Sequence, residues 1–455
     1  MKPNEKSSLV YFNEWLDSFL NFEKMPKKNI FWLKTMKYLC DRFNNPQNSY
    51  KTYHIAGSKG KGSVSSYIAN ILASAGYKTG LYTSPHILNF SERIGSNSGP
   101  FSEEVYEKTV KEIVHLVDSI IPENLPNQRD ATWFELVTLF AFLTFKNAEC
   151  SHCVFETGMG GRLDATNVIF PEVTIITPIE LEHTEFLGDT LEKIAKEKAG
   201  IIKQNIPVVS FNQKPEAKAI LEEVAKEKNC DIYFLDDFLN SYTYKIENEK
   251  SVVELNFKKL FSRPIKTSLN FLGEFQVLNC AVATFACKLV NPEITEEQIE
   301  LGLSKAFLPG RFEIINKDEN KKIPKLILDG AHTKDSLNFT FNNFKSLYNS
   351  KANLLFACAS DKNMDEMTKL FFEDNVKSLI LTKPGFEKGS NLPYLAECTK
   401  KLNEENNNSI DLKIIENPKD AILKSFELAY QKDEPVLICG SFYLLAEVKA
   451  LLQNL

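Results

Sequence analysis

A glycine- and lysine-rich loop is the part of the sequence whose residue types point most directly to chemistry. The segment GSKGKGS follows the apolar run TYHIA and leads into an amphipathic stretch. Glycines let the backbone curl so that successive N–H groups face one anion, a helix start adds partial positive charge, and Lys61 supplies a full one. The loop is shorter than the G-x-x-x-x-G-K-S/T string, and a flexible turn is the alternative. We expect the loop residues to bind a triphosphate: Gly57, Ser58, Lys59, Gly60, Lys61, Gly62 and Ser63.

Three residues that can bind a metal ion follow predicted strands. Ser84 comes after TGLYT, Glu156 ends CVFE, and His183 lies shortly after VTIIT. Ligands of parallel α/β sheets bind beyond the carboxyl ends of the strands, and Mg²⁺ on nucleotide phosphates needs only a few protein ligands. Each residue alone could be a loop residue with a local hydrogen bond. Beside a phosphate loop, the three together predict a magnesium site.

Lys198 stands in the middle of a predicted apolar helix face. The segment LEKIAKEKAGIIK places on that face Leu191, Ile194, Ala195, Ile201 and Ile202. A buried ammonium is costly unless it is paired or loses its charge. The stem of Lys198 could pack in the stripe while its ammonium reaches water or pairs with Glu182 or Glu185, which the residues alone favour. A neutral amine could instead add CO₂ and become a carbamate facing Mg²⁺.

Cys150 and Cys153 have C-x-x-C spacing with His152 between them, which is compatible with a zinc or redox site. No second pair accompanies them, however, and the VFE that follows predicts a buried strand. The nine cysteines of the chain are an odd number, which is typical of reduced thiols rather than of a disulfide framework. We therefore expect Cys150 and Cys153 to be core thiols.

The elements that must position these residues alternate between short apolar runs and amphipathic segments, which predicts an α/β fold with a mostly parallel sheet. Helices are expected from Ser63, over 131–146 and from Leu191, and strands at 52–56, 79–83, 153–156, 173–177 and 207–211. Residues 242–257 suggest a small antiparallel patch, followed by a helix over 279–290. A second α/β series begins after the turn at 308–310, with a loop at 401–409 and strands at 325–330, 352–360, 378–382, 411–416 and 435–441.

Length and composition narrow the class of protein. A chain of 455 residues exceeds one ordinary domain, and 43% hydrophobic with 25% charged residues is typical of a globular protein. A formal net charge of -6 provides no basic field for nucleic acid or an anionic membrane. The first residues lack a signal pattern, and no apolar run reaches about 18 residues. We expect a cytoplasmic protein without nucleic-acid or membrane partners.

Six segments resemble, in this order and over nearly the whole chain, the folylpolyglutamate synthase and dihydrofolate synthase family of Mur-type ligases: HIAGSKGKGS, LYTSPHILNFSERI, ETGMGGRLDATNV, ITPIELEHTEFLGDTLEKIAKEKAGIIK, LPGRFE and LDGAH. The resemblance implies an ATP-dependent ligase that joins L-glutamate to a pteroate or folate carboxylate through an acyl phosphate. It implies a P-loop ATPase domain with a mostly parallel sheet and the folate site at 1–308, and a smaller Rossmann-like domain at 309–455. The segment GGRLDATN resembles that of enzymes that accept dihydropteroate, so we expect both activities.

The resemblance also implies roles for individual residues. Lys61, Lys198 and His183 would be catalytic, and nucleotide contacts would include Asn279, Arg311 and Asp329. The magnesium ligands would be Ser84, Glu156, His183 and Lys198 as a carbamate, since lysine at this place in EKAGI is carbamylated in Mur-type ligases. The pterin pocket would be lined by Thr132, Trp133, Phe134, Glu135, Leu163, Asp164 and Ala165. Trp133 and Phe134 could stack on a flat heterocycle or be core residues, and Asp164 could accept hydrogen bonds from an amino-pyrimidine.

Four features depart from the family pattern: Lys59 replaces an Asn, Glu182 an Asp and Phe275 a His, and GAHTK lacks the usual Asn–Pro. His332 in that last segment would position glutamate or cap a helix. A Mur ligase of cell-wall synthesis would carry a further N-terminal domain, and the segment before Gly57 is too short for one. The remaining alternatives are an enzyme with only one of the two activities and a nucleotide switch without ligase chemistry. We expect a monomer whose partners are ATP, glutamate and the pterin substrate.

Overall fold

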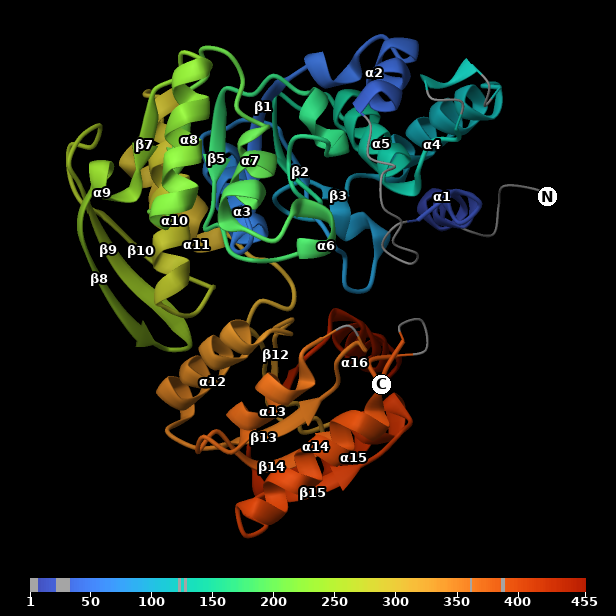
Figure 1. Cartoon of the computed structure of the whole chain (residues 1–455), viewed down its shortest axis with the longest axis vertical. Helices are drawn as coiled ribbons and strands as arrows, with labels where there is room; N and C mark the ends of the chain where they lie inside the picture. Colours follow the sequence, from blue (N-terminus) through green and yellow to red (C-terminus); the bar gives the residue numbers. More distant parts are fainter. Residues whose placement is uncertain (1–6, 22–32, 122–123, 127–128, 361, 386–388) are drawn as a thin grey trace. The chain divides into compact units, whose positions relative to one another are not determined.

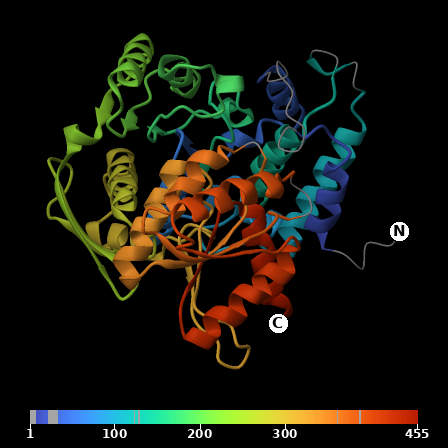
Figure 2. The same ribbon diagram turned by 60° about the horizontal axis from the view of Figure 1, so that its bottom comes forward.

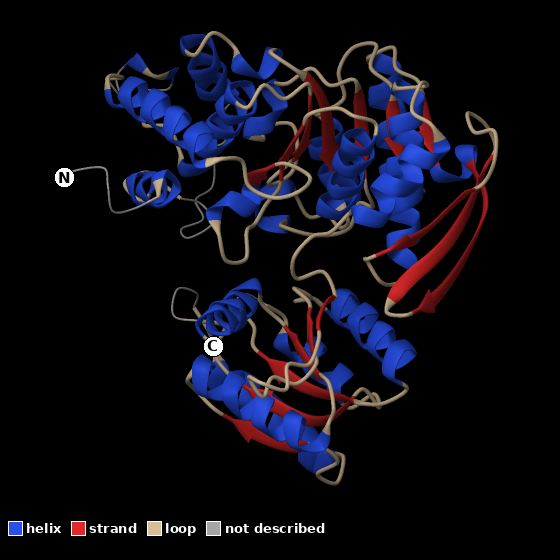
Figure 3. Cartoon of the chain, turned by 180° about the vertical axis from the view of Figure 1, so that it is seen from behind, coloured by secondary structure: helices blue, strands red, loops and turns tan. Residues whose placement is uncertain are grey.

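The computed structural model describes residues 7–21, 33–121, 124–126, 129–360, 362–385 and 389–455, and its contacts divide the chain into two units. Apart from the residues outside these ranges, unit 1 comprises Met1–Lys245, Ser251–Asn270 and Glu274–Phe307 (Figure 1). Unit 2 comprises Ile246–Lys250, Phe271–Gly273 and Leu308–Leu455. Each unit contains a mostly parallel sheet with helices, which confirms the predicted α/β class (Figure 3).

Unit 1 is built on a seven-stranded sheet with the order β3-β2-β4-β1-β5-β6-β7. Its strands are β1 Lys51–Ala56, β2 Thr79–Tyr82, β3 Ile94–Gly95, β4 His152–Glu156, β5 Val173–Ile176, β6 Val208–Ser210 and β7 Ile232–Phe234. Neighbouring strands are parallel except β3, which runs antiparallel to β2. The carboxyl ends of β1, β2, β4 and β5 therefore meet at one edge, because these four strands are consecutive in the sheet.

The strands β1 and β4 lack an apolar–polar alternation because helices cover both faces of the sheet. All of β4 is buried, and so is β1 after its first residue. On one side α3 (Lys61–Ser74) packs over β1, β2 and β4, and α10 (Glu274–Val290) packs on β5 and β6. On β4, Phe155 packs against Phe142 and Phe145 of α5 (Trp133–Asn147).

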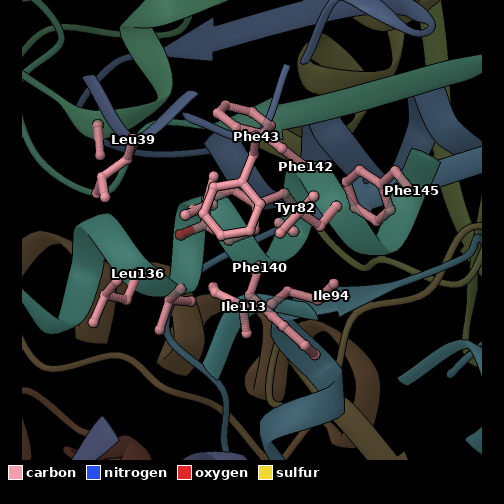
Figure 4. Close-up of a cluster of buried hydrophobic side chains, with 14 of the residues drawn as sticks. Leu39, Phe43, Tyr82, Ile94, Ile113, Leu136, Phe140, Phe142 and Phe145 are labelled. Carbon is pink, nitrogen blue, oxygen red and sulfur yellow. The ribbon is translucent and has the colours of Figure 1, made fainter. Parts of the chain in front are cut away.

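A large apolar cluster of unit 1 surrounds α5. Figure 4 shows Phe140, Phe142 and Phe145 of this helix among Leu39, Phe43, Tyr82, Ile94 and Ile113. The helices that contribute to this cluster or flank it are α1 Ser8–Leu16, α2 Leu33–Arg42 and α4 Glu103–Asp118, with the short η1 Pro46–Asn48, η2 Phe90–Arg93 and η5 Ala165–Val168. This cluster holds the start of α5, where Thr132 and Trp133 lie.

The carboxyl half of unit 1 completes the sheet and adds a small antiparallel one. Its helices are α6 Thr184–Leu187, α7 Leu191–Ala199, α8 Pro215–Glu227, α9 Leu235–Phe238 and α11 Glu296–Lys305. The predicted antiparallel patch is a three-stranded sheet of order β10-β9-β8, with β8 Leu239–Glu247, β9 Lys250–Phe257 and β10 Ile265–Leu269. Of these strands, β10 packs on α11, which in turn packs on α3.

Unit 2 has a six-stranded sheet of order β11-β12-β16-β13-β14-β15 in which only the edge strand β11 is antiparallel. The strands are β11 Glu313–Ile315, β12 Leu326–Leu328, β13 Ala352–Phe356, β14 Val376–Leu381, β15 Asp411–Ile414 and β16 Val436–Cys439. Helices surround this sheet in Figure 2: α12 Lys334–Tyr348, α13 Met364–Phe371, α14 Leu392–Glu405, α15 Pro418–Lys432 and α16 Phe442–Asn454. The predicted second α/β series is thereby confirmed.

Three local expectations need correction. The helix α3 begins at Lys61 rather than Ser63, and α7 ends at Ala199, with Gly200 as its cap, so Ile201 and Ile202 are buried in the turn that follows. The polar segment expected as a loop at 401–409 continues α14 as far as Glu405. Lysine and glutamate are good helix formers, which explains why polarity alone misjudged this segment.

The cysteines are placed as their spacing and number predict. Cys150 and Cys153 are buried and unbridged, as expected of core thiols. Burial raises the pKa of the Cys153 thiol well above its ordinary value, which keeps it protonated and unreactive. Among the helices that the structure describes, none has both the length and the apolar character to cross a membrane.

Candidate active site

The glycine loop packs so closely against its surroundings that side chains are excluded. Gly57 has φ +147°, and a Cβ atom there would lie 1.8 Å from Oγ1 of Thr177 on the segment after β5. Gly60 is the N-cap of α3 with φ +85°, and its Cβ would lie 2.6 Å from Oδ1 of Asn279. The loop therefore curls tightly between β1 and α3, as an anion-binding loop must.

Lys61 and Asn279 both lie at this loop. The Nζ atom of Lys61 donates to the carbonyl of Gly57 at 3.1 Å, so the ammonium folds back over the loop. Asn279 donates to Gln276 at 2.9 Å, while its buried Oδ1 has no hydrogen-bond partner among the described residues. An unpartnered buried acceptor beside the helix start is a place where a ligand donor would bind favourably.

The loop is also held by the segment that follows β5. Ser58 donates from its backbone to the carbonyl of Pro178 at 2.8 Å, and its hydroxyl exchanges hydrogen bonds with the backbone of Glu180 at 2.9 and 3.2 Å. The ammonium of Lys59 forms an ion pair with the Glu180 carboxylate at 2.6 Å. Glu180 is not among the residues that the sequence pointed to; its only signal was its position after a strand of the same sheet edge.

Glu156 and Ser84 are neighbours at that edge. Glu156 is 4% exposed, and its Oε2 accepts a hydrogen bond from the backbone N–H of Ser84 at 3.2 Å. The register pairs Glu156 with Ile55 of β1, two residues before the phosphate loop begins at Gly57. A carboxylate and a serine beside a phosphate cradle suit Mg²⁺, which keeps most of its ligands as water and phosphate oxygens.

His183 lies on the segment that connects β5 to β6. It is the N-cap of α6, with φ +46°, and it is exposed. No group of three or more His, Cys, Asp and Glu side chains among the described residues is arranged to hold a metal ion. The predicted set contains only two residues of these types, Glu156 and His183, together with Ser84 and Lys198. A role of His183 in binding the metal stays a prediction.

Lys198 is buried on the inward face of α7, 1% exposed, as the helical spacing predicts. Its Nζ donates to the carbonyl of Gly57 at 2.8 Å and to Oε1 of Glu182 at 2.7 Å. Burial lowers the pKa of Lys198 to about 8, although the Glu182 carboxylate opposes this shift. Burial alone would raise the pKa of Glu182, but the charges of Lys198 and Lys61 hold it below its ordinary value. The pairing with Glu182 is one of the two arrangements that the sequence left open.

Most of the residues expected around the pterin form structural contacts with neighbouring residues of the protein. Thr132 and Glu135 form a capping box at the start of α5, and Arg129 pairs with the Glu135 carboxylate at 2.8 Å. Trp133 is 4% exposed in the α5 cluster, and Phe134 lies partly buried against Gly158. Trp133 is therefore a core residue in this structure, which is one of the two alternatives that the sequence left open.

Asp164 holds the loop that leads from β4 to η5; Leu163 lies in this loop, and Ala165 is the first residue of η5. The Oδ2 atom of Asp164 accepts from the backbone of Gly158 and Met159 at 2.9 and 3.1 Å. Its Oδ1 accepts from the N–H and hydroxyl of Thr166 at 3.0 and 2.5 Å. A carboxylate has about four acceptor positions. These four bonds make Asp164 an organiser of the loop, a role that the sequence did not suggest.

A buried cation lies beside the expected pterin residues. Arg93 is 2% exposed, its Nε donates to Nδ1 of His86 at 2.6 Å, and its guanidinium lies 4.9 Å from the Trp133 ring centroid. Burial and the Arg93 charge lower the pKa of His86 to about 3, so the ring is neutral and accepts this bond. His86 therefore has a structural contact here, as the acceptor for a buried cation.

Three predicted residues of unit 2 lie together. Asp329 accepts hydrogen bonds from the backbone N–H groups of Phe312 and Ala331, both at 2.8 Å. Burial raises the pKa of the Asp329 carboxyl, and the charge of Arg311 opposes this shift. Arg311 stacks over Phe442 at 4.7 Å, and the ring of His332 meets the same phenylalanine. The N-cap of α12 is Thr333, in a capping box with Ser336, and the backbone N–H of His332 donates to the same Ser336 hydroxyl at 3.2 Å, so His332 lies one residue before the cap.

Comparisons with known proteins cover almost the whole chain. The Mur ligase middle domain matches residues 55–287, and the Mur ligase glutamate ligase domain matches residues 310–442. The dihydrofolate synthase/folylpolyglutamate synthase of Bacillus subtilis is 32% identical over 441 residues, which are 96% of this chain and 97% of that protein. The dihydrofolate synthetase of Saccharomyces cerevisiae is 30% identical over 440 residues, 91% of this chain and 96% of the yeast protein.

The fold is similar as well. A structure of the Mycobacterium tuberculosis folylpolyglutamate synthase complexed with ADP and AMPPCP has a TM-score of 0.84 and 25% sequence identity, with 98% of each chain covered. The glycine loop, the residues at the edge of the sheet and the similarity over both units agree with one another. The chain belongs to the folylpolyglutamate synthase and dihydrofolate synthase family of Mur ligases.

Proposed function

We propose that this protein is an ATP-dependent ligase that adds L-glutamate to the carboxylate of dihydropteroate, of a folate, or of both. The observation that carries the proposal is the glycine loop, which opens onto the same sheet edge as Glu156 and Ser84 and carries Lys61 at the start of α3. Relatives with this activity in their names support the choice of substrates. Residues 1–308 would be the ATPase part with the folate site, and 309–455 the C-terminal ligase part.

The chemistry requires activation because a carboxylate does not react with an amine at neutral pH. The pterin substrate's carboxylate attacks the γ-phosphorus of ATP and forms an acyl phosphate with release of ADP. The amino group of glutamate then attacks the acyl carbon, and phosphate leaves as the amide forms. Lys61 and the N–H groups of the loop neutralise charge on the phosphate oxygens. Mg²⁺, when bound with ATP, would supply further positive charge there, held by Ser84, Glu156 and His183.

Lys198 is proposed to act as a carbamate. A lysine with a pKa lowered to about 8 is partly neutral near physiological pH, and a neutral amine is the nucleophile that CO₂ requires. The nitrogen forms a bond to the carbon of CO₂ and loses a proton, which leaves a carboxylate at the end of the side chain. The carbamate and Glu182 would both be negative. The modified side chain could therefore no longer pair with Glu182 and would have to face a cation instead.

The remaining roles are proposed from the resemblance to the family. Asn279 and the loop residues would bind the nucleotide in unit 1, and Arg311 and Asp329 would contribute from unit 2, where His332 would help to position glutamate. Phe134, Leu163 and Ala165 would line the pterin pocket, with Thr132, Trp133, Glu135 and Asp164 holding its shape. We further propose that the protein is a monomer and that it is cytoplasmic; the unbridged cysteines support only the compartment, because thiols stay reduced in the cytosol.

The test is a phosphate-release assay with ATP and glutamate and, in separate reactions, dihydropteroate or tetrahydrofolate. We expect glutamate-dependent phosphate release with both acceptors. Release with one acceptor would reject bifunctionality and leave a dihydrofolate synthase or a folylpolyglutamate synthase. Nucleotide binding without release for either acceptor would favour a nucleotide switch.

A further inference from the structure

The ion pair between Lys59 and Glu180 places a carboxylate of the protein on a lysine of the phosphate loop. The two charged atoms lie 2.6 Å apart, and the side chains are 28% and 38% exposed. Both residues belong to unit 1 and lie at the carboxyl edge of its sheet, Lys59 after β1 and Glu180 after β5. The pair is therefore located where a triphosphate would approach the loop.

Glu180 is fixed beside the loop by its backbone rather than by the ion pair. Its N–H and its carbonyl both bond to the hydroxyl of Ser58. One residue earlier, the N–H of Ile179 donates to the side chain of Gln213 at 3.0 Å. The carboxylate of Glu180 would thus remain near the loop even if Lys59 turned to another partner.

A phosphate and a carboxylate compete for the same ammonium. Partly exposed ion pairs contribute little to stability, so this pair opens at small cost. Phosphate carries more charge than a carboxylate and binds cations more strongly. The long stem of Lys59 allows its ammonium to turn from Glu180 to phosphates held over the loop.

We propose that Glu180 sets the affinity of the nucleotide site by holding Lys59 when no nucleotide is bound and releasing it to the phosphates when one binds. This inference rests on the proposed nucleotide site. It assigns Glu180 a role in binding, through Lys59, and predicts that removal of the Glu180 charge tightens binding. A residue that merely pinned the loop would have the opposite effect, because its loss would loosen the loop.

The test is a double-mutant cycle on the full chain, with the Kd of Mg²⁺–AMPPCP measured by calorimetry. We expect Glu180→Gln to tighten binding about two- to fivefold. Lys59→Gln should weaken binding. In the Lys59→Gln background, Glu180→Gln should tighten binding less than in the wild type, since the difference measures the exchange of Lys59 between its two partners.

The matched control is Glu185→Gln, an exposed carboxylate five positions further along the chain, which should leave the Kd unchanged. Equal tightening by Glu185→Gln would mean a general charge effect and would overturn the proposal. Weaker binding by Glu180→Gln, or an equal effect of that change with and without Lys59, would also overturn it. Absence of AMPPCP binding to the wild type would instead contradict the proposed function itself.

Discussion

Gly57 lies so close to Thr177 that no Cβ atom fits between them: a Cβ there would lie 1.8 Å from Oγ1 of Thr177, and φ is +147°. Gly57→Ala should therefore displace the phosphate loop and abolish most nucleotide binding, measured by calorimetry with AMPPCP. The control is Gly76→Ala, which has φ +93° but no atom within 4 Å of its Cβ. That change should cost about 1–2 kcal/mol of stability and leave nucleotide binding intact. Normal binding by Gly57→Ala would contradict the role of this glycine.

Glu156→Gln should lower turnover by about 10²- to 10³-fold while the melting temperature changes little, because it removes a charge and keeps the shape. His183→Ala should also lower turnover strongly. Phosphate release at saturating Mg²⁺ is the measurement. Glu172→Gln, at the opposite edge of the same sheet, is the control and should remain active. If the Glu156 and His183 variants both keep near-normal activity, neither residue belongs to the metal site.

Lys198→Ala should lose most activity, and acetate or another short carboxylate should restore part of it by replacing the carbamate's charge. Lys198→Arg should not recover, since a guanidinium cannot form the carbamate. Lys196→Ala, on the exposed side of the same helix, serves as the control and should be fully active. Full activity of Lys198→Ala without added carboxylate would reject the carbamate.

His54 should make the stability of the protein depend on pH. The ring is fully buried, its Nε2 lies 2.8 Å from Oγ1 of Thr166, and that hydroxyl donates to Asp164, so Nε2 carries the hydrogen. Burial and the charge of Lys203 lower the pKa of His54 well below 6.5. Below pH 6.5 the unfolded chain therefore binds one more proton than the folded one, and stability falls as the pH falls.

His54→Gln should keep the donor to Thr166 and remove this titration. Between pH 6.5 and pH 5, the free energy of unfolding of the wild type should fall more steeply than that of the variant, by up to about 1.4 kcal/mol per pH unit. Urea unfolding at several pH values measures the two slopes. Identical slopes would show that His54 is not held neutral by the fold.

The order of the elements could be predicted from the sequence because each depends on local spacing. Continuous apolar runs predict strands covered on both faces, and the 3.6-residue period of α7 is sufficient to predict that Lys198 faces inward. The phosphate loop was recognisable because its glycines and Lys61 are contiguous. Such local patterns can be recognised without knowledge of the fold, although they misplaced the ends of α3, α7 and α14 by a few residues.

The partners of the charged residues depend on the tertiary structure. Lys198 meets the Gly57 carbonyl across 141 positions of sequence, and Lys59 meets Glu180 only because β1 and β5 are adjacent in the sheet. Asp164 could equally have faced a ligand, yet its four acceptor positions are used by its own loop. Local spacing determines which face a side chain occupies, whereas strand order and loop curvature determine which distant group it meets, and those are set by packing of the whole unit.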